Sequence, residues 1–417
     1  MRPIGIDLFA GAGGLSLAFE RAGFDIAAAV EIDPIHCATH EYNFPYCTTL
    51  CRSVIDLSGA EIRRLSGIGS KEIGAVFGGA PCQGFSMIGK RALDDPRNQL
   101  VQHFVRLVRE LRPAYFVFEN VKGLTLGKQR QVLDEMIEAL SVEYKILLPY
   151  RVLNAADYGV PQDRHRLFLV GARHGYEIPS YPKPATKRVT VREALSDLAD
   201  ADRFKELQDR DWVKAPYKGP SNYARRLRGL LNDPHDYSYR RNFDNRLLTS
   251  SLRTSHTEIS RRRFAETEWG KTEPVSRFHK LDPNGQSNTL RAGTASDRGA
   301  FTSPRPIHPD MPRVITNREA ARLHSFPDWF RFHVTKWHGF RQIGNSVPPL
   351  LGQAIASCIV DALGNKPRAP KPVMDLGDPA LLELTMAQAA ERYGVSGDVI
   401  AKRRRTADID RRERVIA

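Results

Sequence analysis

The chain has 417 residues, which is too many for one ordinary core and enough for two or three domains. Hydrophobic residues make up 41% and charged residues 26%, a globular composition that excludes a largely disordered chain. The net charge of +14 favours a polyanionic partner such as nucleic acid.

The N-terminus and the cysteines indicate where the protein works. Met1 leads directly into an apolar strand-like run without a basic region and a long apolar segment, so no secretory signal is expected. No run of eighteen apolar residues occurs, so no membrane-spanning helix is expected. The five cysteines are irregularly spaced, which argues against disulfides, and no second ligand pair follows Cys47 and Cys51, so no metal site is expected. These features predict a cytoplasmic protein without a metal.

The first 175 residues alternate strand-like and helix-like segments. Strands are predicted at residues 4–9, 25–31, 73–77, 115–118 and 167–170. Helices are predicted at about residues 15–22, 99–111 and 129–140, and Pro34 stands where another helix begins. This alternation predicts the α/β class, with a largely parallel sheet covered by helices on both faces.

From about residue 181 the regular alternation gives way to a long polar stretch. Residues 181–310 carry 25 Lys+Arg against 17 Asp+Glu, a surplus of 8 within the chain's total of 14. Regular texture returns near Thr316 and continues through an apolar helix predicted at residues 350–363. A proline-rich linker at residues 366–372 then separates a short tail. We therefore expect four segments, at 1–180, 181–310, 311–365 and 366–417.

Residues 386–405 of the tail are typical of a helix-turn-helix. Small Ala389 and Ala390, Gly394 at the turn and a basic second helix fit that motif. An amphipathic helical pair packed on the rest of the chain explains the same pattern, so both interpretations stay open.

A glycine-rich turn follows the first predicted strand. Gly11, Gly13 and Gly14 do not fit the dinucleotide fingerprint, but such a turn lets backbone approach a ligand at the carboxyl edge of a sheet. Glu31 ends the second strand, where a carboxylate could hold two ribose hydroxyls. Taken alone, these residues indicate either a nucleoside-containing cofactor or a structural turn.

Cys82 lies in a second turn at the same predicted edge, in the sequence Gly-Gly-Ala-Pro-Cys-Gln-Gly-Phe-Ser of residues 78–86. Proline restricts the backbone there, and the flanking glycines permit close approach by a substrate. A cysteine so placed can attack a substrate, provided its thiolate is accessible. For an isolated Pro-Cys pair, a small core thiol would be the better interpretation.

Three charged residues favour the nucleophile. Glu119 closes another strand and delivers a carboxylate to the same edge. Arg164 and Arg166 alternate in an extended segment, so they share one face, and two guanidiniums on one face suit phosphate or carboxylate contacts. Each has a structural alternative, as a helix-cap acid or as a solvated face, but their combination with Cys82 indicates a reactive site.

At this point the chain resembles the DNA (cytosine-5) methyltransferase family of the bacterial restriction-modification type. The resemblance spans about residues 4–363 and is carried by ordered blocks at residues 7–14, 31, 56, 79–86, 97–100, 119–121, 162–166, 318–323 and 342–349. It implies a Rossmann-like sheet of the S-adenosylmethionine-dependent methyltransferases, a smaller irregular target-recognition domain and a short helical C-terminal tail.

The resemblance also implies a reaction. Carbon 5 of cytosine is a poor nucleophile, and attack by the Cys82 thiolate at carbon 6 would make carbon 5 enamine-like. Glu119 would hydrogen-bond ring nitrogen 3 and the exocyclic amine, stabilising the developing charge. Arg166 and Arg164 resemble the arginines that contact the base carbonyl and hold the catalytic loop and glutamate. The target base would be flipped out of the duplex, and the base that removes the carbon 5 proton is not identified.

S-adenosylmethionine is the implied methyl donor. The residues expected to bind it are Phe9, Gly11, Gly13, Gly14, Glu31, Asp56, Leu100, Asn345 and Ser346. Within this set, Glu31 takes the ribose hydroxyls and Asp56 the adenine amine. The residues expected to contact the DNA substrate are Gln83, Ser86 and Thr289. Because the block at 342–349 is far away in sequence, its helix must pack back beside the first strand.

By the same resemblance, residues 1–180 form the catalytic and cofactor-binding domain, to which residues 311–365 return, and 181–310 form the target-recognition domain. Most arginines of 181–310 would contact phosphates and a few would read base edges. The expected partner is double-stranded DNA, bound by a monomer in the bacterial cytoplasm and nucleoid. The compact form indicates a restriction-modification or phage-defence enzyme, functionally paired with an endonuclease.

Two alternatives remain. A related branch of this fold methylates tRNA cytosine, but that branch is compact, whereas the recognition segment here spans about 130 residues. An additional role as an autogenous DNA-binding regulator would use the tail at residues 366–417.

Overall fold

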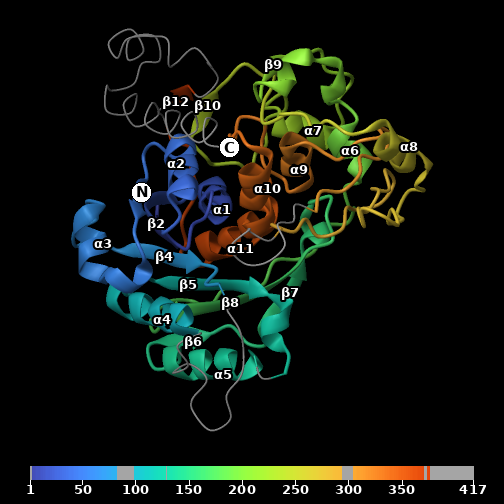
Figure 1. Cartoon of the computed structure of the whole chain (residues 1–417). Coiled ribbons are helices and arrows are strands. Elements are labelled where there is room, and N and C mark those ends of the chain that lie inside the picture. Colours follow the sequence, from blue (N-terminus) through green and yellow to red (C-terminus); the bar gives the residue numbers. More distant parts are fainter. Residues whose placement is uncertain (1, 82–97, 128, 294–303, 371–372, 376–417) are drawn as a thin grey trace.

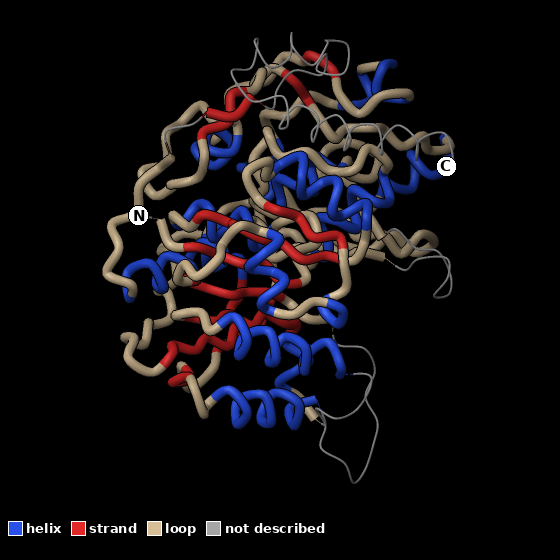
Figure 2. Tube along the Cα trace, turned by 90° about the vertical axis from the view of Figure 1, so that its left-hand side faces the viewer, coloured by secondary structure: helices blue, strands red, loops and turns tan. Residues whose placement is uncertain are grey.

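A central sheet with helices on both faces dominates the chain (Figures 1 and 2). The computed structural model describes residues 2–81, 98–127, 129–293, 304–370 and 373–375. Cys82, Gln83 and Ser86 lie outside the described residues, as does the helix-turn-helix pattern at 386–405.

Eight strands form the central sheet, in the order β3-β2-β1-β4-β5-β8-β6, with β7 also paired to β8. Their bounds are β1 Ile4–Leu8, β2 Asp25–Glu31, β3 Thr48–Cys51, β4 Ile73–Gly78, β5 Tyr115–Val121, β6 Tyr144–Ile146, β7 Arg151–Asn154 and β8 His165–Arg173. The five strands predicted from the sequence are confirmed, whereas β3, β6 and β7 were not predicted. The pairs from β3 to β5 are parallel, as predicted, but β8 runs antiparallel to β5, β6 and β7.

Alternating side chains of the sheet enter two separate cores. On β5, Tyr115 and Val117 pack into one hydrophobic cluster, and Phe116 and Phe118 into the other. The helices of the catalytic part are α1 Gly14–Ala22, α2 Pro34–Asn43, α3 Gly59–Leu65, α4 Gln99–Leu111, α5 Gln129–Leu140, α9 Asn317–Leu323, α10 Lys336–Asn345 and α11 Pro349–Ala362. The predicted helices near 15–22, 99–111, 129–140 and 350–363 are confirmed, and Pro34 begins α2 as predicted.

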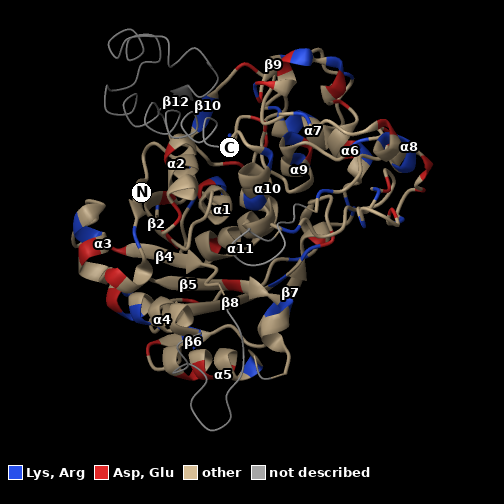
Figure 3. Cartoon of the chain, viewed as in Figure 1, with Lys and Arg blue, Asp and Glu red and all other residues tan. Residues whose placement is uncertain are grey.

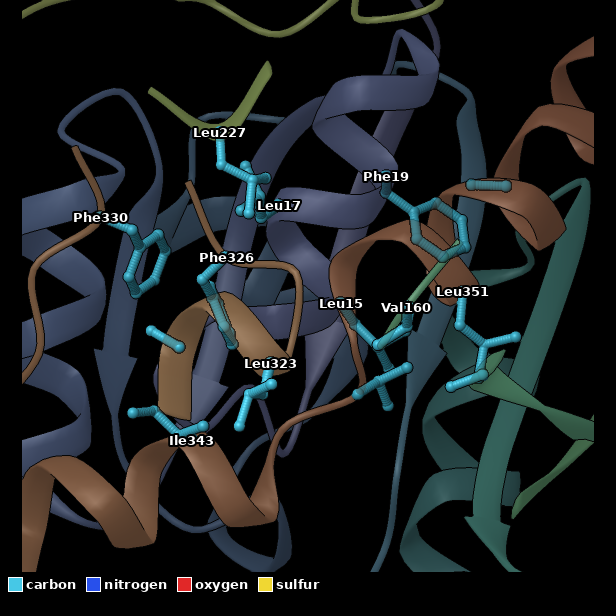
Figure 4. Close-up of a cluster of buried hydrophobic side chains, with 14 of the residues drawn as sticks. Leu15, Leu17, Phe19, Val160, Leu227, Leu323, Phe326, Phe330, Ile343 and Leu351 are labelled. Atoms are coloured by element: carbon cyan, nitrogen blue, oxygen red, sulfur yellow. The ribbon is translucent and has the colours of Figure 1, made fainter. Parts of the chain in front are cut away.

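The first core brings distant parts of the sequence together (Figure 4). Leu15 and Phe19 of α1 lie in the same cluster as Leu351 of α11. A β-carbon on Gly352 would lie 2.6 Å from the β-carbon of Ala18, so the two helices approach closely there. The C-terminal block therefore returns to the start of the chain, where its helix packs on α1, the helix that follows the first strand.

Residues 181–310, here called the insert, are built from short elements at one end of the molecule (Figure 1). Their bounds are α6 Val191–Leu195, β9 Val213–Lys214, α7 Asn222–Leu227, β10 Arg240–Asn242, β11 Leu247–Leu248 and α8 Glu258–Glu266; β11 pairs with β9, and β10 pairs with β12 (Val373–Asp375). Leu195, Leu227 and Leu248 pack in the same cluster as α1 and α11. The insert therefore shares a core with the catalytic part.

One stretch of the described residues, Lys336–Ala362, is long and apolar enough to cross a membrane. It consists of α10 and α11, which Ser346 separates in an extended conformation. Because 72% of its most apolar window is buried inside the protein, the stretch is explained as part of the core.

Candidate active site

Glu119 lies at the carboxyl end of β5, on the edge of the sheet where β4 also ends. Its neighbour on β8 in the register is Phe168, and only 8% of Glu119 is exposed. Burial raises the pKa of the Glu119 carboxyl, and the positive charges of Arg166 and Arg164 oppose that rise without cancelling it. The side chain is therefore poised to carry a proton at higher pH than an ordinary glutamate.

The turn after β4 is fixed against this glutamate. A β-carbon added to Gly79 would lie 2.5 Å from Oε2 of Glu119, so a larger residue would have to displace the carboxylate. The side-chain amide of Asn120 donates a hydrogen bond to the carbonyl of Ala80 at 2.9 Å. Pro81 is the last described residue before Cys82. The chain thus enters the Cys82 segment directly beside Glu119.

Arg166, near the start of β8, holds the other side of Glu119. Its Nε lies 2.9 Å from Oε1 of Glu119, and the two side chains are 14% and 11% exposed. Strand β8 runs antiparallel to β5, so His165 and Arg166 reach the edge at which β5 ends. The predicted carboxylate contact of this arginine is therefore made within the protein.

Arg164 is buried and serves a different purpose from the one its alternation with Arg166 predicts. Its guanidinium donates to the carbonyls of Leu290 at 3.0 Å, Gly344 at 2.7 Å and Ser346 at 3.0 Å. Those carbonyls belong to the insert and to the C-terminal block. Nη1 and Nη2 of Arg164 are thus bonded to backbone carbonyls within the protein, and its buried Nε has no hydrogen-bond acceptor among the described residues.

Gln162 and His324 extend the same framework, and the sequence analysis gave neither residue a role. Gln162 accepts from the amide of Leu290 at 3.2 Å, and its side-chain nitrogen lies 3.0 Å from Nδ1 of His324. Nε2 of His324 lies 2.9 Å from the carbonyl of Ser346. Burial lowers the pKa of His324 well below its usual value, so the ring is neutral. Gln162 had a signal, since it begins the block at 162–166; His324 had none.

Thr289 also joins this framework. Its hydroxyl donates to the carbonyl of Asp163 at 2.6 Å. Two residues earlier, Ser287 exchanges backbone hydrogen bonds with the same loop, to Pro161 at 2.9 Å and from Asp163 at 2.8 Å. The end of the insert is therefore tied to the loop that carries Arg164 and Arg166.

The glycine turn after β1 adopts left-handed backbone at Phe9, Gly11 and Gly13, with φ of 63°, 54° and 102°. No atom lies within 4 Å of a β-carbon placed on Gly11, so the space above it is open. A β-carbon on Gly14 would lie 2.6 Å from the carbonyl of Val347, which holds the C-terminal block against the turn. The turn is therefore open at Gly11 and closely packed against the C-terminal block at Gly14.

Glu31 lies at the end of β2 beside that open space. Oε2 accepts from the amide of Gly11 at 2.8 Å, and Oε1 accepts from the amides of Ile32 and Asp33, each at 2.9 Å. A carboxylate oxygen has two lone pairs, so Oε2 can accept a further bond from a hydroxyl. The open space over Gly11 and this carboxylate together fit the ribose of a nucleoside.

The remaining predicted cofactor residues lie around the same edge. Asp56 is exposed in a 3₁₀ turn, Val54–Asp56, which follows β3, the neighbour of β2. Leu100 lies in the first turn of α4, which packs on that 3₁₀ turn through hydrogen bonds from Arg106 to the carbonyls of Val54 and Leu57. Asn345, which is exposed, and Ser346, which is buried, lie at the end of α10.

A chain of buried hydrogen bonds supports the glycine turn from below. The Ser16 hydroxyl lies 2.7 Å from Oδ2 of Asp7 and 2.9 Å from Nε2 of His40, whose Nδ1 lies 3.0 Å from the Thr49 hydroxyl. Burial raises the pKa of Asp7 to about 8, and Glu31 adds to the rise. These residues belong to β1, α1, α2 and β3, so the chain ties four elements together beneath the turn.

The chain is similar to a family of methylases and to known methyltransferases. Residues 4–361 match the family model described as C-5 cytosine-specific DNA methylase. The chain is 65% identical to the Type II methyltransferase M.XorII of Xanthomonas oryzae pv. oryzae, over 98% of this chain and 96% of that one. It is 36% identical to the Type II methyltransferase M1.HphI of Haemophilus parahaemolyticus, over 85% of this chain and 86% of that one.

Solved structures extend the comparison. A putative DNA modification methyltransferase encoded within an Escherichia coli prophage is 37% identical, with a TM-score of 0.73 over 87% of this chain and all of that one. The Dnmt2 methyltransferase of Schizosaccharomyces pombe is 18% identical, with a TM-score of 0.53 over 87% of this chain and all of that one, and shares the fold.

Proposed function

The chain belongs to the C-5 cytosine-specific DNA methylase family, and we propose that it methylates cytosine through a covalent bond between Cys82 and carbon 6 of a flipped base. It is a DNA cytosine-5 methyltransferase of the restriction-modification type, and its methyl donor is S-adenosylmethionine. The contact between Glu119 and Arg166, beside the entry to the Cys82 segment, carries the proposal.

Glu119 acts on ring nitrogen 3 of the cytosine. When a thiolate adds to carbon 6, electron density moves onto nitrogen 3, which must then be neutralised. A glutamic acid whose pKa is raised by burial keeps its proton to higher pH than an ordinary glutamic acid, and that proton is available to nitrogen 3. Its second oxygen accepts from the exocyclic amine, so one carboxyl group recognises the cytosine edge and activates the ring.

Arg166 holds and adjusts this acid. Its guanidinium opposes the rise in the Glu119 pKa, so the carboxyl can both give the proton to nitrogen 3 and take it back. The remaining guanidinium donors are available to the base carbonyl, which carries part of the developing charge. Arg166 and Glu119 thus work as one unit.

The proposed sequence of bonds is balanced within the site. The Cys82 thiolate adds to carbon 6, and nitrogen 3 takes the proton of Glu119. Carbon 5 would then take the methyl group of S-adenosylmethionine, whose sulfur keeps the electron pair of the broken sulfur–methyl bond and leaves as a neutral thioether. A base then removes the proton of carbon 5, the bond between carbon 6 and sulfur breaks, and nitrogen 3 returns its proton to Glu119. Cys82 leaves as a thiolate, ready for another turnover.

Arg164 is a positioning residue in this account. Its hydrogen bonds brace the loop of Arg166 against the insert and the C-terminal block. Thr289 continues that brace toward the flipped nucleotide. With Gln83 and Ser86 of the Cys82 segment, it is proposed to hold the base and its backbone.

The methyl donor is proposed to lie over the glycine turn. The carboxylate of Glu31 would accept hydrogen bonds from the ribose hydroxyls of the donor, and Asp56 would accept one from its adenine amine. The other residues that would surround it are Phe9, Gly11, Gly13, Gly14, Leu100, Asn345 and Ser346. The glycine turn follows β1 and the turn toward Cys82 follows β4, two neighbouring strands of the sheet, which supports a donor bound beside the Cys82 segment.

The wider role is proposed from the same evidence. Residues 1–180 and 311–365 carry the chemistry, and residues 181–310 recognise the DNA sequence. A monomer in the bacterial cytoplasm would act on duplex DNA at the nucleoid, alongside a restriction endonuclease or in defence against phage. The two Type II relatives support this assignment.

A transfer assay tests the proposal. Purified protein is incubated with S-adenosylmethionine carrying a labelled methyl group and with duplex DNA, tRNA or no nucleic acid. The account predicts label only in duplex DNA, and bisulfite sequencing of that DNA should place it on cytosine within one recurring sequence. Label in the DNA of a Cys82→Ser variant at the wild-type rate would refute the covalent route.

A further inference from the structure

The arginines of the insert are not equally available to DNA. Carboxylates within the protein pair with eight of them: Arg188, Arg228, Arg241, Arg246, Arg253, Arg261, Arg262 and Arg263. In Figure 3, Lys and Arg positions and Asp and Glu positions are interspersed along the ribbon of this part of the molecule. Part of the positive charge is therefore neutralised within the protein. The arginines of the insert that lie outside such pairs, among the residues that the structure describes, are Arg192, Arg203, Arg210, Arg225, Arg226, Arg240, Arg277, Arg291 and Arg305.

Arg277 lies in one well-defined element, a hairpin between residues 271 and 280. Thr272 and His279 form an antiparallel bridge, and the amide of Lys280 donates to the carbonyl of Lys271 at 2.8 Å. The amide of Glu273 donates to the carbonyl of Phe278, also at 2.8 Å. These bonds close the hairpin and leave residues 274–277 as its tip, here called the hairpin tip.

The side chain of Glu273 holds the hairpin tip from inside. Glu273 is 1% exposed, and its carboxylate accepts from the amides of Val275 at 3.1 Å and Ser276 at 2.5 Å. Arg263 of α8 lies 3.7 Å from the same carboxylate. The amide of Arg277 donates to the Glu273 carbonyl at 2.9 Å. Such a fully bonded turn is a rigid one.

The hairpin tip presents its side chains outward. Val275 is 67% exposed, so its apolar side chain is open to a partner. Arg277 is exposed and adopts a left-handed backbone with a φ of 61°, a conformation disfavoured for arginine. Among the described residues, no carboxylate lies within ion-pair distance of Arg277. The hairpin tip thus exposes to solvent the apolar side chain of Val275 and the guanidinium of Arg277.

The base of the hairpin is anchored to the insert. The Lys280 ammonium donates to the carbonyls of Phe264 at 3.0 Å and Ala265 at 3.2 Å, at the end of α8. Phe278 packs on Phe264 and Ile307. Hydrogen bonds and apolar contacts therefore fix the hairpin relative to α8.

The hairpin also connects directly to the reactive site. The chain runs from Lys280 to Ser287, which is bonded to Pro161, and on to Leu290, whose carbonyl accepts from Arg164. In Figure 1, α8 lies on the side of the molecule toward which β4 and β5 point. A duplex engaged at that edge can therefore meet the hairpin tip.

We infer that the hairpin tip reads base edges of the duplex that carries the target cytosine, with Arg277 and Val275 as its recognition residues. This inference rests on the proposed function and identifies the part of the insert that sets the sequence. Arginine forms two parallel hydrogen bonds to guanine, and an apolar side chain contacts the methyl group of thymine. A rigid tip suits both contacts, since the side chains need little further ordering on binding.

The test selects bound duplexes from a pool randomised in sequence, using the full-length wild-type protein and variants, and compares the recovered sequences. The wild type is expected to recover one sequence. For Arg277→Ala and Arg277→Lys, we expect discrimination at one base pair to fall by about 10- to 100-fold. Lysine keeps the charge but loses the two-pronged contact, so it separates base reading from phosphate contact.

Two further variants make the test specific. Val275→Ser is expected to relax selection at a neighbouring position, and Arg246→Ala, which removes an exposed arginine of the insert paired with Asp244, is expected to recover the wild-type sequence. The hairpin inference fails if the Arg277 and Val275 variants recover the wild-type sequence with unchanged affinity. It also fails if Arg277→Lys keeps the full discrimination of the wild type, because lysine cannot make the paired contact to guanine. Selection does not require methyl transfer, so a wild type that selects a sequence without methylating it would contradict only the proposed function.

Discussion

The guanidinium of Arg166 lies 2.9 Å from the carboxylate of Glu119, although both side chains are almost buried. Burial favours the neutral acid and the arginine favours the carboxylate, so the two effects compete at one group. Removing either alters the proton that the site can offer to cytosine.

Arg166→Gln should raise the Glu119 pKa further, since the opposing positive charge is lost. In the proposed mechanism, loss of the Glu119 proton sets the alkaline limb of the profile of kcat against pH. We expect that limb to move to higher pH in the variant, together with a fall in kcat of about 100-fold from the lost positioning. An alkaline limb that stays in place in Arg166→Gln but moves in a variant remote from Glu119 would assign the titration to another group.

Gly79→Ala should displace Glu119. The new β-carbon would lie 2.5 Å from Oε2 of Glu119, well inside contact distance, while the turn at Gly11 and Glu31 is untouched. We expect kcat to fall by about 100-fold or more, with unchanged affinity for S-adenosylmethionine measured by calorimetry. Gly67→Ala is a matched control, since no atom lies within 4 Å of its added β-carbon, although its φ of 68° carries its own strain. Similar kcat values for the two variants would disprove the close packing at Gly79.

Arg164→Gln should destabilise the fold as well as slow the reaction. The variant loses charged hydrogen bonds to three carbonyls, from Leu290, Gly344 and Ser346, that stay buried. We expect the free energy of unfolding to fall by about 2–4 kcal/mol in urea titrations. If Arg164 instead faced the DNA, the variant would keep its stability and lose only affinity for duplex.

Asp7→Asn should flatten the dependence of stability on pH. The pKa of Asp7 rises from an ordinary value near 3.8 to about 8 on folding, so the folded state holds a proton that the unfolded state releases between those values. Its contribution to stability is therefore full below pH 4 and is lost as the pH rises toward 8. Asparagine retains an acceptor for Ser16 and does not titrate. We expect the variant to gain stability over the wild type between pH 5 and 8 in thermal unfolding.

A difference in stability that does not change with pH would contradict this prediction. If wild type and Asp7→Asn kept a constant difference in unfolding temperature across that range, Asp7 would titrate alike in both states. Glu31 acts on Asp7 through its charge, and His40 reaches Asp7 through the hydroxyl of Ser16, so Ser16→Ala serves as a second variant that leaves both residues in place.

Much of the fold follows from local patterns in the sequence. The apolar runs that became β1, β2, β4, β5 and β8 lie in the sheet as predicted, and Pro34 begins α2. The short β3 at Thr48–Cys51 shows no alternation of apolar and polar residues and was missed. The direction of β8 is not encoded locally, because a run of apolar residues reads alike in parallel and antiparallel pairs.

Local sequence patterns predict only part of the candidate site. Glu119 and Glu31 are found because carboxyl ends of parallel strands meet at one edge. The burial of Arg164 depends on carbonyls 126, 180 and 182 residues away, so no local pattern could reveal it. The same holds for the contact of His324 with Gln162, 162 residues distant.

The most direct test of the covalent mechanism is adduct formation on DNA that contains 5-fluorocytosine at the methylated position. Fluorine cannot leave carbon 5 as a proton does, so methyl transfer should trap the enzyme on the duplex. The account predicts a denaturation-resistant complex that requires S-adenosylmethionine, contains Cys82 in its cross-linked peptide by mass spectrometry, and is absent in Cys82→Ser. A trapped complex of equal yield in Cys82→Ser, or one linked through another residue, would contradict it.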